Sequence, residues 1–195
     1  MANINFNNIK FVASYGTASQ LPEKSKPEIA FVGRSNVGKS SLLNKICNNK
    51  NLAKVSSTPG KTSTINFFDA GTCYFVDLPG YGYAKRAKSE LMRWSNLIDE
   101  YFASDREFAL VVALLDVRHE PSDLDIQMIN YIHELGLPFI IVLTKADKLS
   151  KQQQSLAKEK LYKNFDFDQR IPVYLCSSEK NIGISEVRNI IQELS

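Results

Sequence analysis

The sequence has little of what marks secreted, disulfide-rich or zinc-binding proteins. Its 195 residues include only three cysteines, Cys47, Cys73 and Cys176, with no CxxC pair and no zinc-ligand spacing to either histidine. An odd number of scattered cysteines is typical of buried thiols in a reducing compartment. We therefore expect neither a disulfide framework nor a zinc site.

The sequence also has no long hydrophobic run, and we expect no signal peptide. The longest apolar run, Phe108–Leu115, has eight residues, whereas a transmembrane helix needs about 20. Met1–Lys10 lacks the basic and apolar regions of a signal peptide. The net charge is only +3, which slightly favours anionic partners. We expect a cytoplasmic, monomeric protein without a membrane partner.

What is present is a hydrophobic content of 44%, enough for a core. Residues 1–25 are rich in Asn and weakly patterned, so we predict an N-terminal extension there, with at most one edge strand around Lys10–Ala13. Residues 26–195 are expected to form one α/β domain. Short apolar runs predict strands at Glu28–Val32, Thr64–Asp69, Cys73–Asp77, Phe108–Asp116, Phe139–Thr144 and Val173–Cys176.

Helical stripes separate most of these strands. Strands joined through a helix must be parallel, but only three residues, 70–72, separate the second and third, which predicts an antiparallel hairpin. The expected architecture is a three-layer α/β domain with a mostly parallel six-stranded sheet, one antiparallel strand and helices on both faces. The stripes lie around Leu42–Cys47, Leu91–Tyr101, Leu124–Leu135, Ala157–Phe165 and Val187–Leu194, and Ser122 with Asp125 forms a capping-box pattern before the third.

The segment Gly33-Arg34-Ser35-Asn36-Val37-Gly38-Lys39-Ser40 matches GxxxxGK[ST] between a predicted strand and a predicted helix. Its glycines let backbone N–H groups face a phosphate chain, and the helix N-terminus points its positive end at the same anion. Lys39 would add a charge to the β- and γ-phosphates, and the Ser40 hydroxyl can ligate Mg²⁺. The alternative is a glycine turn without a ligand. The segment predicts a nucleoside triphosphate site with Mg²⁺.

Three further segments follow the ends of predicted strands. In Asp77-Leu78-Pro79-Gly80, Asp77 would hold Mg²⁺ through a water and the Gly80 N–H would meet a γ-phosphate oxygen. In Thr144-Lys145-Ala146-Asp147, the Asp147 carboxylate would accept two hydrogen bonds from guanine, with the Lys145 stem over the base plane. Read alone, Asp147 could instead be a helix N-cap. Backbone N–H groups of Cys176-Ser177-Ser178 would meet the guanine O6. These segments predict GTP and GDP as ligands.

Five segments stand in series along the chain: Gly33–Ser41, Pro59–Thr62, Asp77–Gly82, Asp116–Pro121 and Thr144–Asp147. Together they resemble the EngB family of bacterial GTPases, also called YihA or YsxC, from about residue 28 to the C-terminus. The resemblance implies a Ras-like P-loop GTPase fold, GTP hydrolysis with Mg²⁺ and a role in assembly of the large (50S) ribosomal subunit. It also implies a requirement for normal cell division and septation.

The resemblance further implies that Thr62 is the switch threonine, which ligates Mg²⁺ and meets the γ-phosphate. Nucleotide contacts would then extend over Gly60-Lys61-Thr62-Ser63-Thr64. From the residues alone, Thr58 or Thr64 could take this role. The metal ligands would be Ser40, Thr62 and, through a water, Asp77.

We expect slow intrinsic hydrolysis, because Ras uses a Gln after DxxG to orient the attacking water, whereas Tyr81 stands here. Asn36 occupies the position at which some GTPases hold K⁺ near the phosphates, and such a cation could replace an arginine finger. Alternatively, Asn36 only bonds its own backbone. The expected catalytic residues are Lys39, Thr62, Gly80 and Asn36, with K⁺ as a candidate second cofactor.

Two basic segments could dock on RNA phosphates of the 50S subunit, and either could instead be a solvated helix face. For Arg118 we expect a structural ion pair with Asp123 or Asp125. The basic segments are Lys85-Arg86-Ala87-Lys88, and the set Lys148, Lys151, Lys158, Lys160 and Lys163.

Three functions are compatible with these features. The first is a GTP-dependent switch in ribosome assembly, and the second is a nucleotide-gated interaction module of the division machinery with incidental hydrolysis. The third is a P-loop ATPase or kinase, against which the segment Thr144–Asp147 argues.

Overall fold

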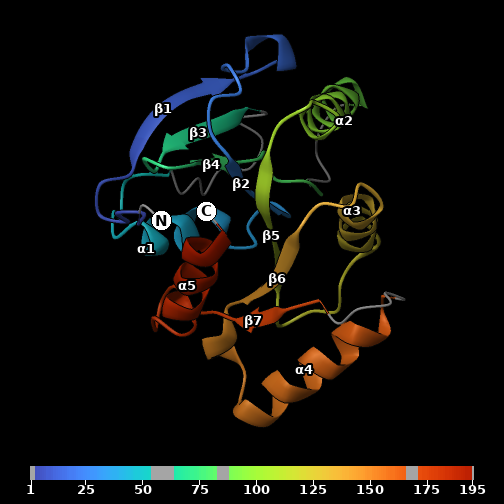
Figure 1. The fold of residues 1–195 in the computed structure, drawn as a ribbon. Coiled ribbons are helices and arrows are strands. Elements are labelled where there is room, and N and C mark those ends of the chain that lie inside the picture. Colours follow the sequence, from blue (N-terminus) through green and yellow to red (C-terminus); the bar gives the residue numbers. More distant parts are fainter. Residues whose placement is uncertain (1–2, 54–63, 83–87, 166–170, 195) are drawn as a thin grey trace.

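A seven-stranded β-sheet runs through the computed structural model, which describes residues 3–53, 64–82, 88–165 and 171–194 (Figure 1). The order of the strands across the sheet is β1-β3-β4-β2-β5-β6-β7. Each of the six expected strands is present, with bounds that differ by at most one residue. The strands are β1 (Lys10–Tyr15), β2 (Glu28–Gly33), β3 (Ile65–Asp69), β4 (Tyr74–Asp77), β5 (Phe108–Asp116), β6 (Phe139–Thr144) and β7 (Val173–Leu175).

The strand β3 alone runs against the others. It pairs antiparallel with β4, as the short hairpin connection predicts, and antiparallel with β1 on its other side. All remaining pairs are parallel. The sheet has seven strands rather than six because β1 pairs with β3, from Lys10 opposite Asp69 to Tyr15 opposite Ile65, with one shift of register between Phe11 and Ala13. Residues that are mostly exposed, as in β1, give only a weak sequence signal for a strand.

Helices cover both faces of the sheet, as expected. Figure 1 shows α1 and α5 on one side, α2 and α3 on the other, and α4 beside the β7 edge. Capping boxes begin α3, where Ser122 and Asp125 confirm the predicted pattern, and α4, where Ser150 and Gln153 form a second one. The helices are α1 (Lys39–Ile46), α2 (Lys88–Phe102), α3 (Asp123–Glu134), α4 (Lys151–Lys163) and α5 (Ile184–Leu194), with a 3₁₀ turn at Ala146–Lys148.

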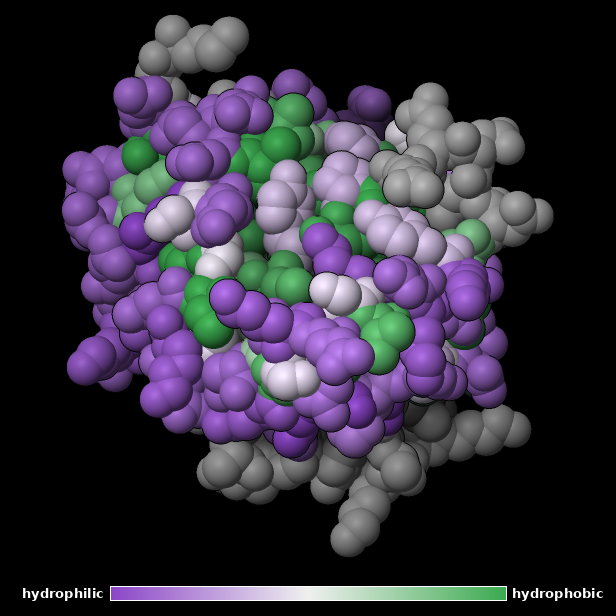
Figure 2. Space-filling model, turned by 90° about the horizontal axis from the view of Figure 1, so that it is seen from below, coloured by the Kyte–Doolittle hydropathy of each residue, from purple (hydrophilic) through white to green (hydrophobic). Residues whose placement is uncertain are grey.

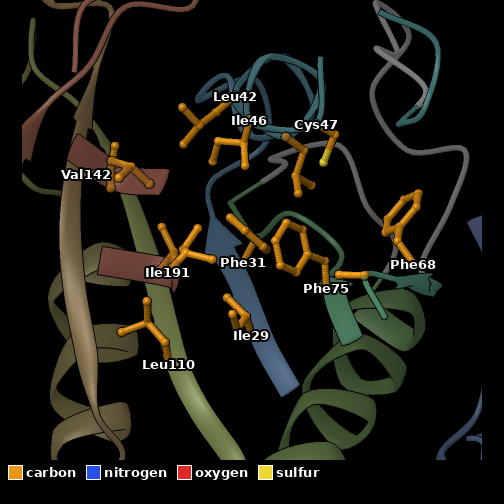
Figure 3. Packing of buried hydrophobic residues seen from close by; sticks show 14 of the residues in the cluster. Ile29, Phe31, Leu42, Ile46, Cys47, Phe68, Phe75, Leu110, Val142 and Ile191 are labelled. Carbon is orange, nitrogen blue, oxygen red and sulfur yellow. The ribbon is translucent and has the colours of Figure 1, made fainter. Parts of the chain in front are cut away.

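The core on the α1 side joins that helix to the middle of the sheet. Leu42 and Ile46 of α1, and Cys47 directly after the helix, point toward Phe31 and Phe75 of the strands (Figure 3), and all five are at most 1% exposed. Burial fixes the position of α1 against β2, and so the position of the loop that joins them. Each completely buried side chain of this size stabilises the fold by roughly 1.5–3 kcal/mol.

The three cysteines are buried, as predicted, and form no disulfide. Burial raises the pKa of Cys47 and of Cys176 to about 12, and that of Cys73 to about 11. The thiols therefore stay protonated at physiological pH and act as small apolar side chains.

The N-terminal segment is packed into the same core as α1 and α5. Ile4 and Ile9 are each 5% exposed, and the Ile4 backbone N–H donates to Gln192 Oε1 of α5 over 2.9 Å. The two ends of the chain consequently lie side by side (Figure 1). The division into an extension and a GTPase domain stays a prediction.

The face on the α4 side is mostly hydrophilic, with hydrophobic residues visible between the polar ones near its middle (Figure 2). Two members of the predicted basic set are in ion pairs here: Lys148 with Asp147 and Glu179, and Lys160 with Glu120. Among the helices of the described ranges, none is long and apolar enough to cross a bilayer.

Candidate functional site

The loops after five neighbouring strands lie at one edge of the sheet. Because β4, β2, β5, β6 and β7 are parallel and adjacent, their carboxyl ends point the same way. Such an edge is where ligands bind in open α/β sheets. The loops bring together Gly33–Ser40 after β2, Asp77–Gly80 after β4, Asp116 at the end of β5, Thr144–Asp147 after β6 and Cys176–Ser178 after β7.

The loop between β2 and α1 has the backbone that its sequence predicts. Gly38 precedes α1 with φ +106°, a conformation that favours glycine, and Asn36 has φ +66°. A Cβ at Gly33 would lie 2.9 Å from Val37 Cγ1 and 3.0 Å from the Leu114 carbonyl oxygen, so no side chain fits there. The loop thus closes tightly at the N-terminus of α1, where an anion is stabilised.

Lys39 and Asp77 meet beside this loop. Their side chains form a salt bridge, and they are only 11% and 9% exposed. Asn66 Nδ2 lies 3.5 Å from Asp77 Oδ2, and Thr64 Oγ1 donates to Asn66 Oδ1 over 3.3 Å, so Thr64 belongs to the same polar cluster. The predicted residues Gly60, Lys61, Thr62 and Ser63 lie outside the described residues, as does the alternative Thr58.

The loop after β4 packs on the loop after β2. A Cβ at Gly80 would lie 3.0 Å from the Ser35 backbone nitrogen, and the Ser35 N–H donates to the Tyr81 carbonyl oxygen over 2.8 Å. The Tyr81 hydroxyl donates to Asp125 Oδ1 of α3 over 2.9 Å. The Tyr81 hydroxyl therefore has a buried partner in α3.

The segment after β6 is tied to the loop after β2. The Thr144 hydroxyl lies 2.7 Å from the Val37 carbonyl oxygen and 3.1 Å from that of Leu115. Lys145 Nζ donates to the Asn36 carbonyl oxygen over 2.9 Å and to Asp116 Oδ2 over 2.8 Å. These contacts hold two predicted ligand-binding segments, 107 residues apart or more in the chain, at a fixed separation.

Asp147 is held from two sides. The Ser177 hydroxyl donates to Asp147 Oδ1 over 2.5 Å, and Lys148 Nζ lies 3.0 Å from Asp147 Oδ2. Ser177 first, and then Lys148, hold the pKa of Asp147 below its ordinary value, so its carboxylate is ionised at neutral pH and able to accept hydrogen bonds. The sequence predicted Ser177 only for its backbone. The signal that could have predicted the contact of its side chain is its position just after β7, since β7 is the neighbour of the strand that precedes Asp147.

The sequence analysis predicted that the N–H groups of Cys176 and Ser177 donate to a ligand, but both have partners within the fold. The Cys176 N–H donates to the Leu143 carbonyl oxygen over 2.8 Å, and the Ser177 N–H donates to that of Ile182 over 2.9 Å. Both bonds follow from the pairing of this segment with β6 and with Ile182. Of the three predicted N–H donors, only that of Ser178 has no partner in the described chain.

Known proteins are similar to this chain over most of its length. Residues 28–145 match the family model described as "50S ribosome-binding GTPase". The "Probable GTP-binding protein EngB" of Leuconostoc citreum is 44% identical over 186 residues, which cover 94% of this chain and 96% of the relative. The chain belongs to the EngB family.

Solved structures show the same fold. A crystal structure of a probable GTP-binding protein engB has a TM-score of 0.73 at 22% identity, and covers 86% of this chain and 97% of that chain. A crystal structure of Era in complex with MgGDPNP and a segment of 16S ribosomal RNA has a TM-score of 0.64 at 21% identity, and covers 88% of this chain and 57% of that chain.

In this EngB-family chain the residue Arg118 pairs differently from the sequence prediction. Its Nε and Nη2 donate to Asp116 over 2.9 and 2.7 Å, so the expected pair with Asp123 or Asp125 is wrong. Asp116 is the nearer partner because it ends β5 two residues earlier. Arg34, rather than Arg118, lies near Asp125, with 3.9 Å between Nη1 and Oδ2.

The Asn36 side chain is exposed and has no hydrogen-bond partner among the described residues. The alternative prediction, in which the amide bonds its own backbone, is not observed, since the Asn36 side chain forms no hydrogen bond with the residues that the structure describes. Only the Asn36 carbonyl oxygen is used, by Lys145. A polar cavity of about 220 Å³ lies between residues 34–37 and 116–121, on the side of Asp116 and Arg118.

Replacing Asp116 by Asn tests the network beside the loop. Burial alone would raise the pKa of Asp116, but hydrogen bonds from Arg118 and Lys145 outweigh it and hold the pKa well below its ordinary value. A carboxylate with a lowered pKa stabilises the folded state above its unfolded pKa of about 3.9, and this contribution disappears as the pH falls toward the folded pKa. We expect Asp116→Asn to reduce the free energy of unfolding by about 1–2 kcal/mol at pH 7, with a smaller difference from the parent below pH 4.

The measurement is urea unfolding between pH 3 and pH 7. Asp105→Asn is the control, because Asp105 is an exposed aspartate with one distant ion-pair partner, Lys24 at 3.6 Å. A difference between Asp116→Asn and the parent that does not change with pH would contradict the proposed ion-pair energetics.

Proposed function

We propose that this chain binds GTP with Mg²⁺, hydrolyses it slowly and acts as a nucleotide-dependent switch. The observation that carries the proposal is the meeting of four predicted ligand-binding segments, 33–40, 77–80, 144–147 and 176–178, at the carboxyl edge of adjacent parallel strands. Membership of the EngB family and the match to a ribosome-binding GTPase model support it.

The residues have chemically distinct roles in this proposal. Backbone N–H groups of residues 33–40 and the Lys39 ammonium would bind the phosphates, and Asp147 would accept the guanine N–H donors. The Gly80 N–H would meet the γ-phosphate. Ser177 would contribute by holding Asp147 through its hydroxyl, and Cys176 through its carbonyl oxygen, which accepts from the N–H of the preceding Ala146, rather than through their own N–H groups.

The residues at Lys39 fit a magnesium ion. Ser40 and Asp77 offer a hydroxyl and a carboxylate, the hard oxygen ligands that Mg²⁺ prefers, and Asp77 is brought to the loop by the pairing of β4 with β2. Thr62 would complete the set. Bound Mg²⁺ would neutralise phosphate charge during hydrolysis. The crystal structure of Era with MgGDPNP supports this cofactor.

Nucleotide binding can be tested with three variants. We expect the parent to bind GTP and GDP but not ATP in calorimetric titrations. Lys39→Ala should weaken GTP binding by about 100-fold, because about 2.7 kcal/mol of charge-assisted contacts is lost. Lys45→Ala, at the other end of α1, is the matched control. Asp147→Ala should abolish the preference for GTP over ATP. GTP binding that is unchanged in Lys39→Ala would refute the site.

We further propose that K⁺ stimulates hydrolysis through Asn36. The proposal is supported by the Asn36 side chain, which is exposed and has no hydrogen bond with the described residues. It lies at the edge of the loop after β2, where it could coordinate a cation near the phosphates. The expected result is faster GTP turnover in K⁺ than in Na⁺ for the parent, and equal turnover in the two salts for Asn36→Ala. Equal turnover of the parent in both salts would exclude this role.

We propose the 50S ribosomal subunit or its precursor as the partner, with consequences for cell division and septation, in a cytoplasmic monomer. The ribosome-binding description of the matched family model supports the partner. In co-sedimentation with 50S subunits, we expect more binding with a non-hydrolysable GTP analogue than with GDP.

The contribution of the first basic segment to that binding has a separate test. Lys85→Glu should weaken the association and reduce its dependence on salt, because one phosphate contact is lost. Lys24→Glu, a half-exposed lysine of the N-terminal segment, is the control. Equal binding in all nucleotide states would instead favour the interaction module of the division machinery.

A further inference from the structure

The two neighbours of Gly80 are each held by a different helix. On one side, Trp94 Nε1 of α2 donates to the Pro79 carbonyl oxygen over 3.0 Å. On the other side, the Tyr81 hydroxyl donates to Asp125 Oδ1 of α3 over 2.9 Å. Gly80 therefore lies between two anchor points that belong to separate secondary-structure elements.

The two anchors also touch each other. The rings of Tyr81 and Trp94 pack edge to face with their centroids 6.1 Å apart, and Tyr81 is only 6% exposed. We call Trp94, Tyr81 and Asp125 the Gly80 clamp. Its members are contributed by α2, by the loop after β4 and by α3, so a shift of Gly80 would disturb all three elements.

Asp125 is well supported as the end of this clamp. Its Oδ2 accepts hydrogen bonds from the Ser122 N–H and hydroxyl over 2.9 and 2.7 Å. The first of these bonds, with the bond from the Asp125 N–H to Ser122 Oγ, forms the capping box of α3. Arg34 of the loop after β2 lies 3.9 Å from the same oxygen. Burial, and then the charge of Asp125, raise the pKa of Tyr81, so the phenol stays protonated and continues to donate.

The loop after β2 closes the third side of Gly80. A side chain at Gly80 would collide with Ser35, and the Ser35 N–H is bonded to the Tyr81 carbonyl oxygen. The backbone of residue 80 is thus confined by contacts on both neighbours and on its Cα. Confinement of a donor before a ligand arrives reduces the cost of ordering it on binding.

We propose that the Gly80 clamp positions the Gly80 N–H for the terminal phosphate and so raises the affinity of this site for a nucleoside triphosphate relative to a diphosphate. Tyr81 and Asp125 are positioning residues in this proposal, which rests on the proposed binding of GTP. The clamp deepens that function by assigning triphosphate recognition to residues that do not themselves touch the nucleotide.

Tyr81→Phe tests the clamp, because it keeps the ring and removes only the hydroxyl. Tyr101→Phe is a matched control: the Tyr101 hydroxyl also donates to a buried carboxylate, Glu28, over 2.8 Å, but at the opposite end of β2 from the candidate site. The two variants remove the same bond in the same kind of environment. The measurement gives the dissociation constants of a non-hydrolysable GTP analogue and of GDP, each in the presence of Mg²⁺, for the parent and both variants.

We expect Tyr81→Phe to lower the affinity for the GTP analogue about three- to tenfold relative to GDP, as the loss of one hydrogen bond predicts. Tyr101→Phe should leave that ratio unchanged, even though its melting temperature falls. If Tyr81→Phe leaves the ratio unchanged in a parent that binds both nucleotides, the clamp is refuted and GTP binding stands. A parent that binds neither nucleotide refutes both.

A second measurement needs no variant, because Trp94 is the only tryptophan of the chain. Its indole is bonded to Pro79 and packed on Tyr81, so its emission reports on both neighbours of Gly80. Because these contacts are formed before a nucleotide binds, we expect the emission of the parent to change little with either GDP or the Mg²⁺-bound GTP analogue. A large change in emission with the analogue would mean that Trp94 leaves its partners, and would overturn the proposal.

Discussion

Parallel pairing of β2 with both β4 and β5 is the constraint on which the candidate site depends. It places the loop after β2 between Asp77, at the end of β4, and Asp116, at the end of β5. Neither carboxylate is near the loop in the sequence. The pairing continues beyond the strand ends, because the backbone of Tyr81 bonds to Gly33 and to Ser35. The register of the strands therefore also positions the loops after β2 and β4 against each other.

On each side of the loop after β2, a carboxylate forms an ion pair with a lysine. On one side Lys39 pairs with Asp77, and on the other Lys145 pairs with Asp116, which Arg118 also holds. Cations that are kept near the loop by carboxylates of neighbouring strands need little reorganisation to meet an anionic ligand. The same pairing keeps these partly buried ammonium groups from being left without a counter-charge, which would cost several kcal/mol.

The helices α2 and α3 each contact the candidate site through one polar side chain. Trp94 of α2 and Asp125 of α3 each reach one neighbour of Gly80, and Thr144 joins the loop after β2 to β5 and β6. Movement of any of these loops must therefore break at least one specific hydrogen bond. This links the segment after β4 to two helices on the same face of the sheet (Figure 1).

The sequence by itself determined the strands, the hairpin, the capping box of α3 and the segment Gly33–Ser40, since each is a pattern within a few residues whose cause is local: side-chain period, loop length or a glycine that needs positive φ. Only the tertiary structure decided which side chains meet. The pairing of β1 with β3, the Ser177–Asp147 and Tyr81–Asp125 bonds, the choice of Asp116 by Arg118 and the use of the Cys176 and Ser177 N–H groups depend on strand register and helix position. These are fixed by contacts between residues far apart in the chain, which no local pattern records.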